Sequence, residues 1–389
     1  MRRLILFPVL NNKKIIYLDN AGSSLKFKNS VNSITNCYKN TPLNLHSFSS
    51  NIIHEKIKKI VDDTRRKFSE LLRCNKNDVF FIPSFSYALN FLALSFSKRS
   101  NFTKEEILLT KLEHSSNLYP WIKAVSNEKN VKYVELNFDF SINKDNLRKS
   151  LCKKTKIFSF CHISNNVGVK NDIKNLVNIV RSIVPNCIVI IDGSQSISSE
   201  EINVEEWDID VFLFSCHKFY SSTGIGIMYM NEKARKFFPE IFWGGGSDLS
   251  NNKMKFEVGS LPTAEIFGIY EAVSIIKKLN LEKLRKKRKN LLLYTLNKLK
   301  KIESLKLYNE GVSESIILFN IEGFHSHDIS DFLAKRNIYV RSGNFCTPFI
   351  SELIKVKSAI RLSLALYNNK SEIDLLLNYL RNLNIFQMI

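Results

Sequence analysis

Apolar residues along this chain form two alternating patterns. Apolar runs of about four to eight residues are typical of strands buried on both faces of a sheet, and longer stretches with apolar residues three and four apart predict helices. Helical stretches such as 52–72 and 172–184 alternate with strand-like runs. These runs are DVFFI at 78–82, EILLT at 106–110, VKYVEL at 131–136, KIFSFCHI at 156–163, CIVIID at 187–192 and DVFLF at 210–214. The alternation predicts an α/β fold around a large, mostly parallel sheet.

The pattern changes near the last third of the chain. A long helical stretch within 256–279 is followed by shorter strands and helices. The length of 389 residues also exceeds the roughly 100–200 residues of a typical domain. We therefore expect a large α/β domain over 15–262 and a small α+β domain over 263–389.

The residues that follow two neighbouring strand runs form a chemical set. Ligands of parallel sheets bind at the carboxyl ends of the strands. Pyridoxal phosphate requires an amine for its Schiff base, a carboxylate against its ring nitrogen and small donors for its phosphate. Lys218 can supply the amine, Asp192 the carboxylate, Gln195 a contact to the phenolic oxygen, and Ser215 with His217 the phosphate donors. A lone lysine is usually a solvated surface amine, but this setting favours a cofactor site.

Ten segments in the same order resemble fold-type I pyridoxal phosphate enzymes of the class V aminotransferase group. They are YLDNAGSS, NLHSFSS, EHSSNLYPW, HISNNVG, DGSQS, SCHKFYSSTGIG, GGGSD, FEVGS, RSGNFC and IRLSLALYNN. Within that group the chain is similar to the group II (Suf-type) cysteine desulfurases and their selenocysteine lyase relatives. The resemblance implies a fold-type I transferase with the two domains above, residues 1–14 packing on the small one. It also implies pyridoxal 5'-phosphate as the cofactor.

Three further residues take their expected roles from this resemblance. Ser86 opens a helix in PSFSYALN and is expected to bind the cofactor phosphate, although a serine at a helix start is more often a simple cap. His114 is expected to stack over the cofactor ring and exchange protons, against the alternative of a structural histidine. Asn165 is expected to contact the phenolic oxygen or the substrate. Ser84 and Tyr87 stand where the family has Gly and Glu.

One of the seven cysteines stands apart from the others. Their odd number and the absence of CxxC pairs argue against a disulfide framework and against structural zinc, so no metal is expected. Cys346 lies in the polar loop VRSGNFCTPF, where a thiol is exposed enough to react. The resemblance implies that it receives a persulfide. Asn344 and Phe345 replace two histidines common in group II, which leaves loop chemistry and partner choice open.

Two arginines are candidates for binding the substrate. Arg361 stands in an apolar stretch and needs an acidic partner, so physics alone leaves a buried ion pair and a bidentate substrate carboxylate as equal alternatives. The resemblance favours the carboxylate. Arg341 precedes the cysteine loop and is expected to position substrate or loop. Ser260 matches a residue that reaches the neighbouring subunit's cofactor phosphate, which implies a homodimer with shared sites, against the alternative of a plain turn.

The resemblance thus implies a cysteine desulfurase that converts L-cysteine to L-alanine and passes sulfur to an acceptor or scaffold protein of Fe–S cluster assembly. Three alternatives stay open. The first is a selenocysteine lyase, and the second is another class V aminotransferase or lyase that does not use Cys346. The third is a non-enzymatic basic binding protein on the same scaffold, against which the retention of Lys218, Asp192 and Arg361 argues.

The strong positive charge changes this interpretation little. Fifty-seven Lys and Arg against 37 Asp and Glu give a net charge of +20, yet the basic residues are spread along the chain and cluster only on one helix face at 281–302. We therefore expect no nucleic-acid partner. No apolar run reaches the roughly 18 residues of a membrane span, and no cleavage site follows the N-terminal MRRLILF. We expect a cytoplasmic protein without membrane contact.

Overall fold

A seven-stranded mixed sheet forms the larger part of the molecule. The computed structural model describes residues 6–12, 15–41, 52–99, 104–125, 127–244 and 256–383. The NLHSFSS motif and most of GGGSD fall outside these ranges. The strand order is β2-β8-β7-β6-β5-β3-β4, and only the pairings of β8 are antiparallel. The strands are β2 (Val79–Ile82), β3 (Glu106–Thr110), β4 (Val131–Val134), β5 (Thr155–Cys161), β6 (Ile188–Asp192), β7 (Val211–Ser215) and β8 (Gly226–Met230).

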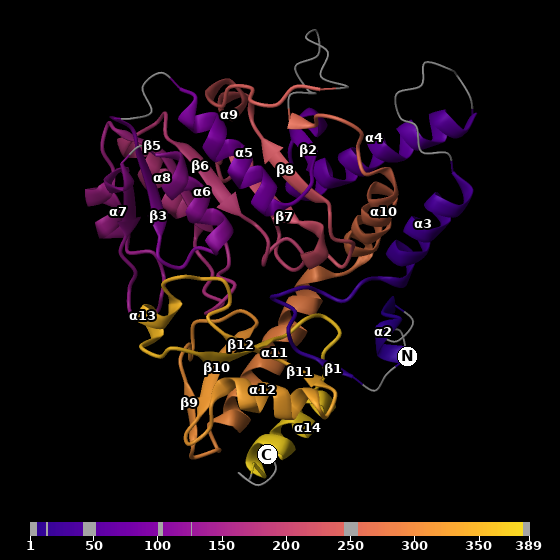
Figure 1. Ribbon diagram of the computed structural model, residues 1–389, viewed down its shortest axis with the longest axis vertical. Helices are drawn as coiled ribbons and strands as arrows, with labels where there is room; N and C mark the ends of the chain where they lie inside the picture. The colour runs from indigo at the N-terminus through magenta and orange to yellow at the C-terminus, as the bar shows by residue number, and fades with distance from the viewer. Residues whose placement is uncertain are drawn as a thin grey trace.

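Helices cover both faces of this sheet (Figure 1). Alternate side chains of each strand enter different cores. In β7, for example, Phe212 and Phe214 join one apolar cluster while Val211 and Leu213 join the other. The first cluster includes residues of α4 (Ile52–Leu72), α7 (Lys144–Ser150), α8 (Ile173–Ile183) and α10 (Thr263–Lys278). The second includes residues of α5 (Phe85–Ser97), α6 (Tyr119–Ala124) and α9 (Glu232–Phe237). Burial on both faces explains why the strand runs are continuously apolar, and the predicted fold class is confirmed.

A smaller antiparallel sheet lies below the first in Figure 1. Its order is β12-β13-β10-β9, and a two-stranded parallel pair, β1-β11, lies beside it. The strands are β1 (Ile16–Tyr17), β9 (Leu305–Leu307), β10 (Ile316–Ile321), β11 (Ile338–Tyr339), β12 (Arg341–Gly343) and β13 (Ala359–Ser363). The helices that follow α10 are α11 (Leu281–Leu299), α12 (Ser326–Ala334), α13 (Ile350–Ile354) and α14 (Lys370–Arg381). A third apolar cluster joins this sheet to α11, α12 and α14.

The packing around α10 bears on where the two parts divide. The buried side chains of α10, Ile266 and Val273 among them, join the core of the large sheet and pack on α4 and α3 (Lys28–Asn40). The next helix, α11, belongs to the smaller core, which Ile16 and Leu18 also join. Phe7, from the segment expected on the small domain, packs against Phe27, Tyr220 and Tyr367, which joins it to the larger core. The division after residue 262 stays a prediction, and this packing would draw it nearer residue 280.

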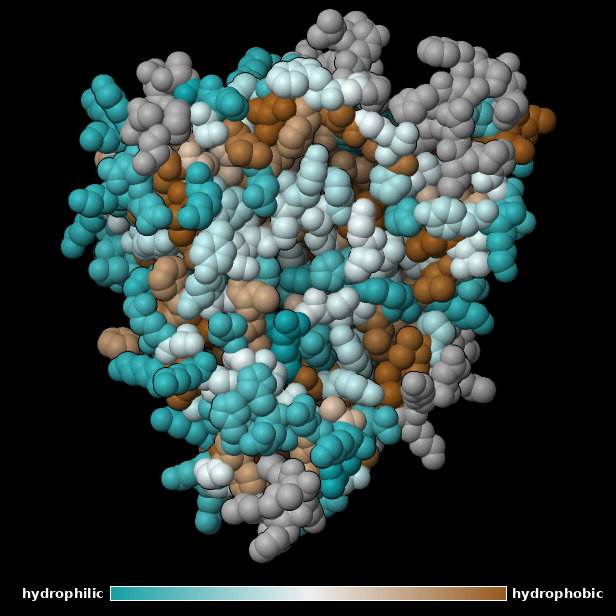
Figure 2. Space-filling view, in the orientation of Figure 1, coloured by the Kyte–Doolittle hydropathy of each residue, from teal (hydrophilic) through white to brown (hydrophobic). Residues whose placement is uncertain are grey.

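The two sheets meet at the carboxyl ends of the parallel strands. An isolated bridge joins Val169, which follows β5, to Ser313, which precedes β10, across the junction. None of the helices in the described ranges is both long and apolar enough to cross a bilayer. Hydrophilic side chains are spread over the whole face seen in Figure 2 rather than gathered in one place.

Candidate active site

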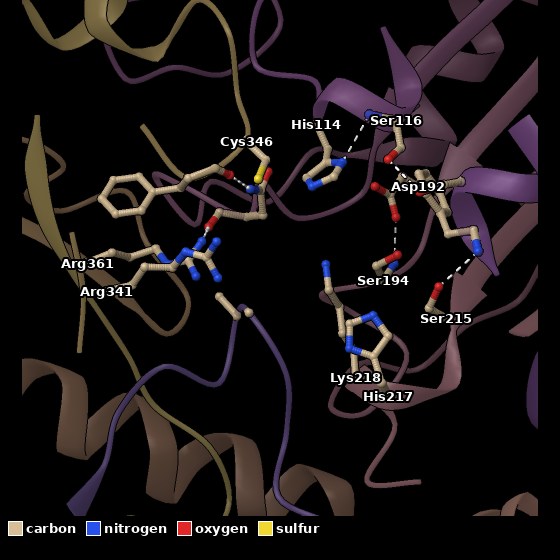
Figure 3. A pocket seen from close by; sticks show the side chains of 16 residues that line it. His114, Ser116, Asp192, Ser194, Ser215, His217, Lys218, Arg341, Cys346 and Arg361 are labelled. Carbon is tan, nitrogen blue, oxygen red and sulfur yellow. Dashed lines mark hydrogen bonds between the residues drawn. The ribbon is translucent and has the colours of Figure 1, made fainter. Parts of the chain in front are cut away.

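A cleft of about 560 Å³ opens where the strand ends meet the smaller sheet. Side chains that are distant in the sequence converge there because parallel strands end at one edge (Figure 3). Ten of the predicted site residues line it: Ser86, His114, Asn165, Asp192, Ser215, His217, Lys218, Arg341, Cys346 and Arg361. The remaining two, Gln195 and Ser260, do not line this cleft.

Lys218 and Asp192 form the charged centre of the cleft. Asp192 is the last residue of β6, and Lys218 closes the short 3-10 turn that follows β7. Burial lowers the pKa of Lys218, with Asp192 opposing that shift, and burial likewise raises the pKa of Asp192, with Lys218 opposing it. Ser194 N donates to Asp192 Oδ1 at 2.8 Å. Within the described ranges Lys218 Nζ has no hydrogen bond, so the cleft holds an available amine beside a buried carboxylate, as pyridoxal phosphate requires.

Small polar groups gather on one side of Lys218. Phe85 N, the first amide of α5, donates to Ser215 Oγ at 2.9 Å. Ser86 Oγ lies 2.7 Å from Ser116 Oγ, and His217 Nδ1 lies 3.3 Å from Ser23 Oγ. The Ser86 and Ser215 hydroxyls lie at the start of the 13-residue helix α5, and the His217 imidazole lines the same cleft; such a set is suited to an anionic phosphate. The residues present therefore fit the cofactor's ring and phosphate requirements.

His114 lies on the turn that follows β3, directed into the cleft (Figure 3). Its Nδ1 accepts a hydrogen bond from Ser116 N at 3.1 Å, so in the neutral ring the proton sits on Nε2. Burial lowers the pKa of His114 to about 4, and the positive charges of Lys218 and Arg361 add to this shift. At neutral pH His114 is thus an uncharged ring that can donate from Nε2.

Arg361 forms the ion pair that was one of the two alternatives left open by its sequence, and its role toward a substrate carboxylate stays a prediction. It lies on β13, is 2% exposed, and donates from Nη2 to Asp19 Oδ1 at 2.8 Å and from Nη1 to Asn165 O at 2.9 Å. Its Nε is buried without a hydrogen-bond partner in the described part of the chain. Arg341 lies 3.8 Å from the other oxygen of Asp19 and is more exposed. The ion pair is real, and the unpaired Nε leaves donor capacity for a further carboxylate.

Cys346 lies in the loop between β12 and α13. Its side chain is exposed, and its carbonyl accepts a hydrogen bond from Ser115 N at 2.8 Å, which ties the loop to the turn beside His114. Cys346 lines the same cleft as Lys218 and Arg361. Asn165 Nδ2 donates to Phe345 O at 3.1 Å, so its amide holds the loop.

Two predicted residues lie elsewhere. Gln195 Nε2 donates to Ala21 O at 2.9 Å, and Gln195 lines an adjoining cavity that Lys218 also borders. Ser260 is exposed just before α10. A role for Ser260 in a neighbouring subunit stays a prediction, as do the roles of the other site residues.

The sequence did not single out three residues that the fold brings to the site. Asp19 forms ion pairs with Arg341 and Arg361. In the sequence, Asp19 was only part of the motif YLDNAGSS, which supported the family resemblance without giving Asp19 a role. Lys26 Nζ donates to His217 O at 2.8 Å, beside the turn of Lys218, and burial lowers its pKa to about 8. Glu113 is buried behind His114, and burial raises its pKa to about 7. An ionisable residue three positions after the end of a buried strand was the available signal for Glu113.

Comparisons with known proteins agree with this geometry. The sequence profile of the family described as aminotransferase class-V matches residues 16–376. A "Cysteine desulfurase" of Wigglesworthia glossinidia brevipalpis is 30% identical over 97% of this chain and 95% of the relative. A "Probable cysteine desulfurase" of Borreliella burgdorferi is 31% identical over 95% of this chain and 92% of the relative. The solved apo cysteine desulfurase of Thermococcus onnurineus NA1 superposes with a TM-score of 0.88 at 23% identity, covering 98% of this chain and 96% of that one, which shows a shared fold.

Proposed function

The chain belongs to the aminotransferase class-V family, and we propose that it is a pyridoxal phosphate-dependent cysteine desulfurase. The reaction converts L-cysteine to L-alanine and leaves the sulfur as a persulfide on Cys346. One observation carries the proposal: an exposed thiol lies in the same cleft as a partly buried lysine, a buried aspartate and a buried arginine. A class V enzyme with no use for a thiol would not need that placement.

When bound, pyridoxal phosphate withdraws electrons from the substrate's Cα, which weakens the bonds that must break. Lys218 would hold it covalently, Asp192 would pair with its ring nitrogen, and Ser86, Ser215 and His217 would bind its phosphate. Because burial lowers the pKa of Lys218, its amine is more often neutral than that of a surface lysine and can accept a proton. His114, neutral with its proton on Nε2, is placed to donate one.

Arg361 would bind the substrate carboxylate and thereby direct the substrate's thiol toward Cys346. In the transfer, the substrate's Cβ–S bond breaks and an S–S bond to Cys346 Sγ forms. A proton takes the place of the sulfur on Cβ, which yields alanine. The reaction needs no added oxidant or reductant, because the thiol of Cys346 is oxidised while the substrate carbon is reduced.

We further propose a homodimer in which Ser260 reaches the neighbouring site. Support comes from exposed aromatic and aliphatic side chains near α5 and α6 on the same side as the cleft: Tyr87, Leu94, Tyr119, Phe242 and Trp243. Figure 2 shows a pale area of intermediate hydropathy over these two helices. Such a surface is typical of an interface core. We also propose that the protein is a group II enzyme located in the cytoplasm, and that it passes its sulfur to an acceptor or scaffold protein of Fe–S assembly.

The test is an assay of alanine and sulfide release from L-cysteine by the pyridoxal phosphate-loaded protein, with selenocysteine run in parallel. We expect alanine from L-cysteine and a mass increase of one sulfur on the peptide that contains Cys346. Turnover of selenocysteine alone would indicate a selenocysteine lyase. Amino-group transfer without sulfur release would indicate an aminotransferase, and no cofactor absorbance would indicate a binding protein.

A further inference from the structure

Phe345, the residue before Cys346, is buried although its neighbour is exposed. It is 4% exposed and belongs to a small apolar cluster with Leu112, Val167 and Ile350. A phenylalanine ring in such a cluster is a large apolar anchor. The loop is thus attached to the protein by the residue next to its reactive thiol.

The backbone at this point adopts an uncommon conformation. Phe345 and Cys346 have φ angles of 56° and 59°, so two successive non-glycine residues lie in the left-handed region. Such residues are held only where the surroundings determine them. Here Asn165 Nδ2 binds the carbonyl of Phe345 at 3.1 Å and Ser115 N binds the carbonyl of Cys346 at 2.8 Å. With these bonds and the buried ring in place, the thiol stays on the cleft side.

The same ring contacts Arg361. The guanidinium carbon lies 4.9 Å from the centroid of the Phe345 ring, within the range of a cation–π interaction. Arg361 is buried, its two Nη atoms are hydrogen-bonded to Asp19 and Asn165, and the Phe345 ring packs against the same guanidinium. Phe345 therefore touches the group expected to bind the substrate carboxylate and also anchors the loop that carries the nucleophile.

We propose that Phe345 is a positioning residue that sets the placement of Cys346 relative to Arg361. The inference rests on the proposed function for the roles of those two groups. The ring acts through both neighbours and does not react itself. A phenylalanine carries no titratable group, so this anchoring is independent of pH in itself.

Three variants of the pyridoxal phosphate-loaded protein separate the two contacts. Phe345→Leu keeps an apolar anchor but removes the ring, so we expect KM for L-cysteine to rise about 3- to 10-fold with kcat nearly unchanged. Phe345→Ala removes both the apolar anchor of the loop and the ring contact to Arg361, so kcat should fall as well as KM rise. Phe349→Leu is the matched control, because that ring contacts Tyr133 and Lys111 instead of Arg361. It should leave KM unchanged.

Hydrogen–deuterium exchange of the 341–349 peptide gives a readout that does not depend on activity. We expect exchange in Phe345→Ala at least about tenfold faster than in the parent, and near-parent exchange in Phe345→Leu. Parent-like exchange in Phe345→Ala, or parent-like KM in Phe345→Leu, would overturn the proposal. If Phe345→Ala does not fold, the comparison of Phe345→Leu with Phe349→Leu still decides it. If the parent protein releases no alanine, the proposed function fails, whereas the exchange result still tests the anchor.

Discussion

Arg361 provides the sharpest test of the site, because its structural and catalytic roles can be separated by substitution. It bonds to Asp19 at 2.8 Å and to the carbonyl of Asn165 at 2.9 Å, and its Nε is unpaired among the described residues. Arg361→Lys keeps the positive charge beside Asp19 but cannot form a two-pronged contact. Asp19→Asn removes the ion pair but keeps the guanidinium.

The expected size of each effect follows from these contacts. A lost charge-assisted hydrogen bond is worth about 1.5–3 kcal/mol, which corresponds to a loss of roughly 10- to 150-fold in kcat/KM for Arg361→Lys. Arg361→Gln also leaves Asp19 without its main partner. Because the side chain of Asp19 is 20% exposed, water compensates in part, and we expect a stability loss of about 1–3 kcal/mol, below that of a fully buried pair.

The assay combines kcat/KM for L-cysteine with urea unfolding of the same proteins, and cofactor absorbance checks that the site is loaded. We expect Arg361→Lys to lose activity with little loss of stability, and Asp19→Asn to lose stability with a smaller loss of activity. A double-mutant cycle between the two positions measures their coupling. If folded Arg361→Gln keeps the parent kcat/KM while stability falls, the ion pair is the whole role of Arg361 and our reasoning about the substrate is wrong.

Three further predictions concern the amine of Lys218, the thiol of Cys346 and the buried imidazole of His162. Borohydride reduction and peptide mapping should locate the cofactor on Lys218 and find none attached in Lys218→Ala; attachment to Lys26, the amine beside the same turn, would show that the assignment is incorrect. Cys346→Ser should keep the cofactor spectrum and lose persulfide formation by mass mapping, and alanine release at the parent rate by this variant would contradict the role of Cys346. Burial lowers the pKa of His162 to about 3. Between pH 6.5 and 3 the folded state therefore binds fewer protons at this residue than the unfolded state does. The free energy of unfolding should then fall on acidification by about 1.4 kcal/mol per pH unit from His162. His162→Leu should show a shallower decline in the urea midpoint between pH 7 and 5, and an unchanged slope would contradict the shift.

The large sheet and the strand-end residues were predictable because they depend on local pattern. Strands such as β6 and β7 are buried on both faces, so their apolar runs stand out in the sequence. Parallel strands end at one edge, so Asp192, Lys218 and His114 could be expected near one another from their positions after the strand runs. The resemblance then supplied chemical roles for these residues.

Other features depend on contacts between segments far apart in the chain. Asp19 and Arg361 are 342 positions apart, and Asn165 and Phe345 are 180 apart, so no local pattern indicates either pair. In the sequence Phe345 was only a departure from two common histidines; burial of its ring under Arg361 makes it an anchor. Hydrophobic periodicity and strand direction are local properties, so the amino-acid order alone specifies which strands form and which side chains stand at their ends. The contacts that fix the loop of Cys346, and the pairing of Arg361 with Asp19, form only in the folded chain. They depend on packing and charge between segments that are far apart in the sequence.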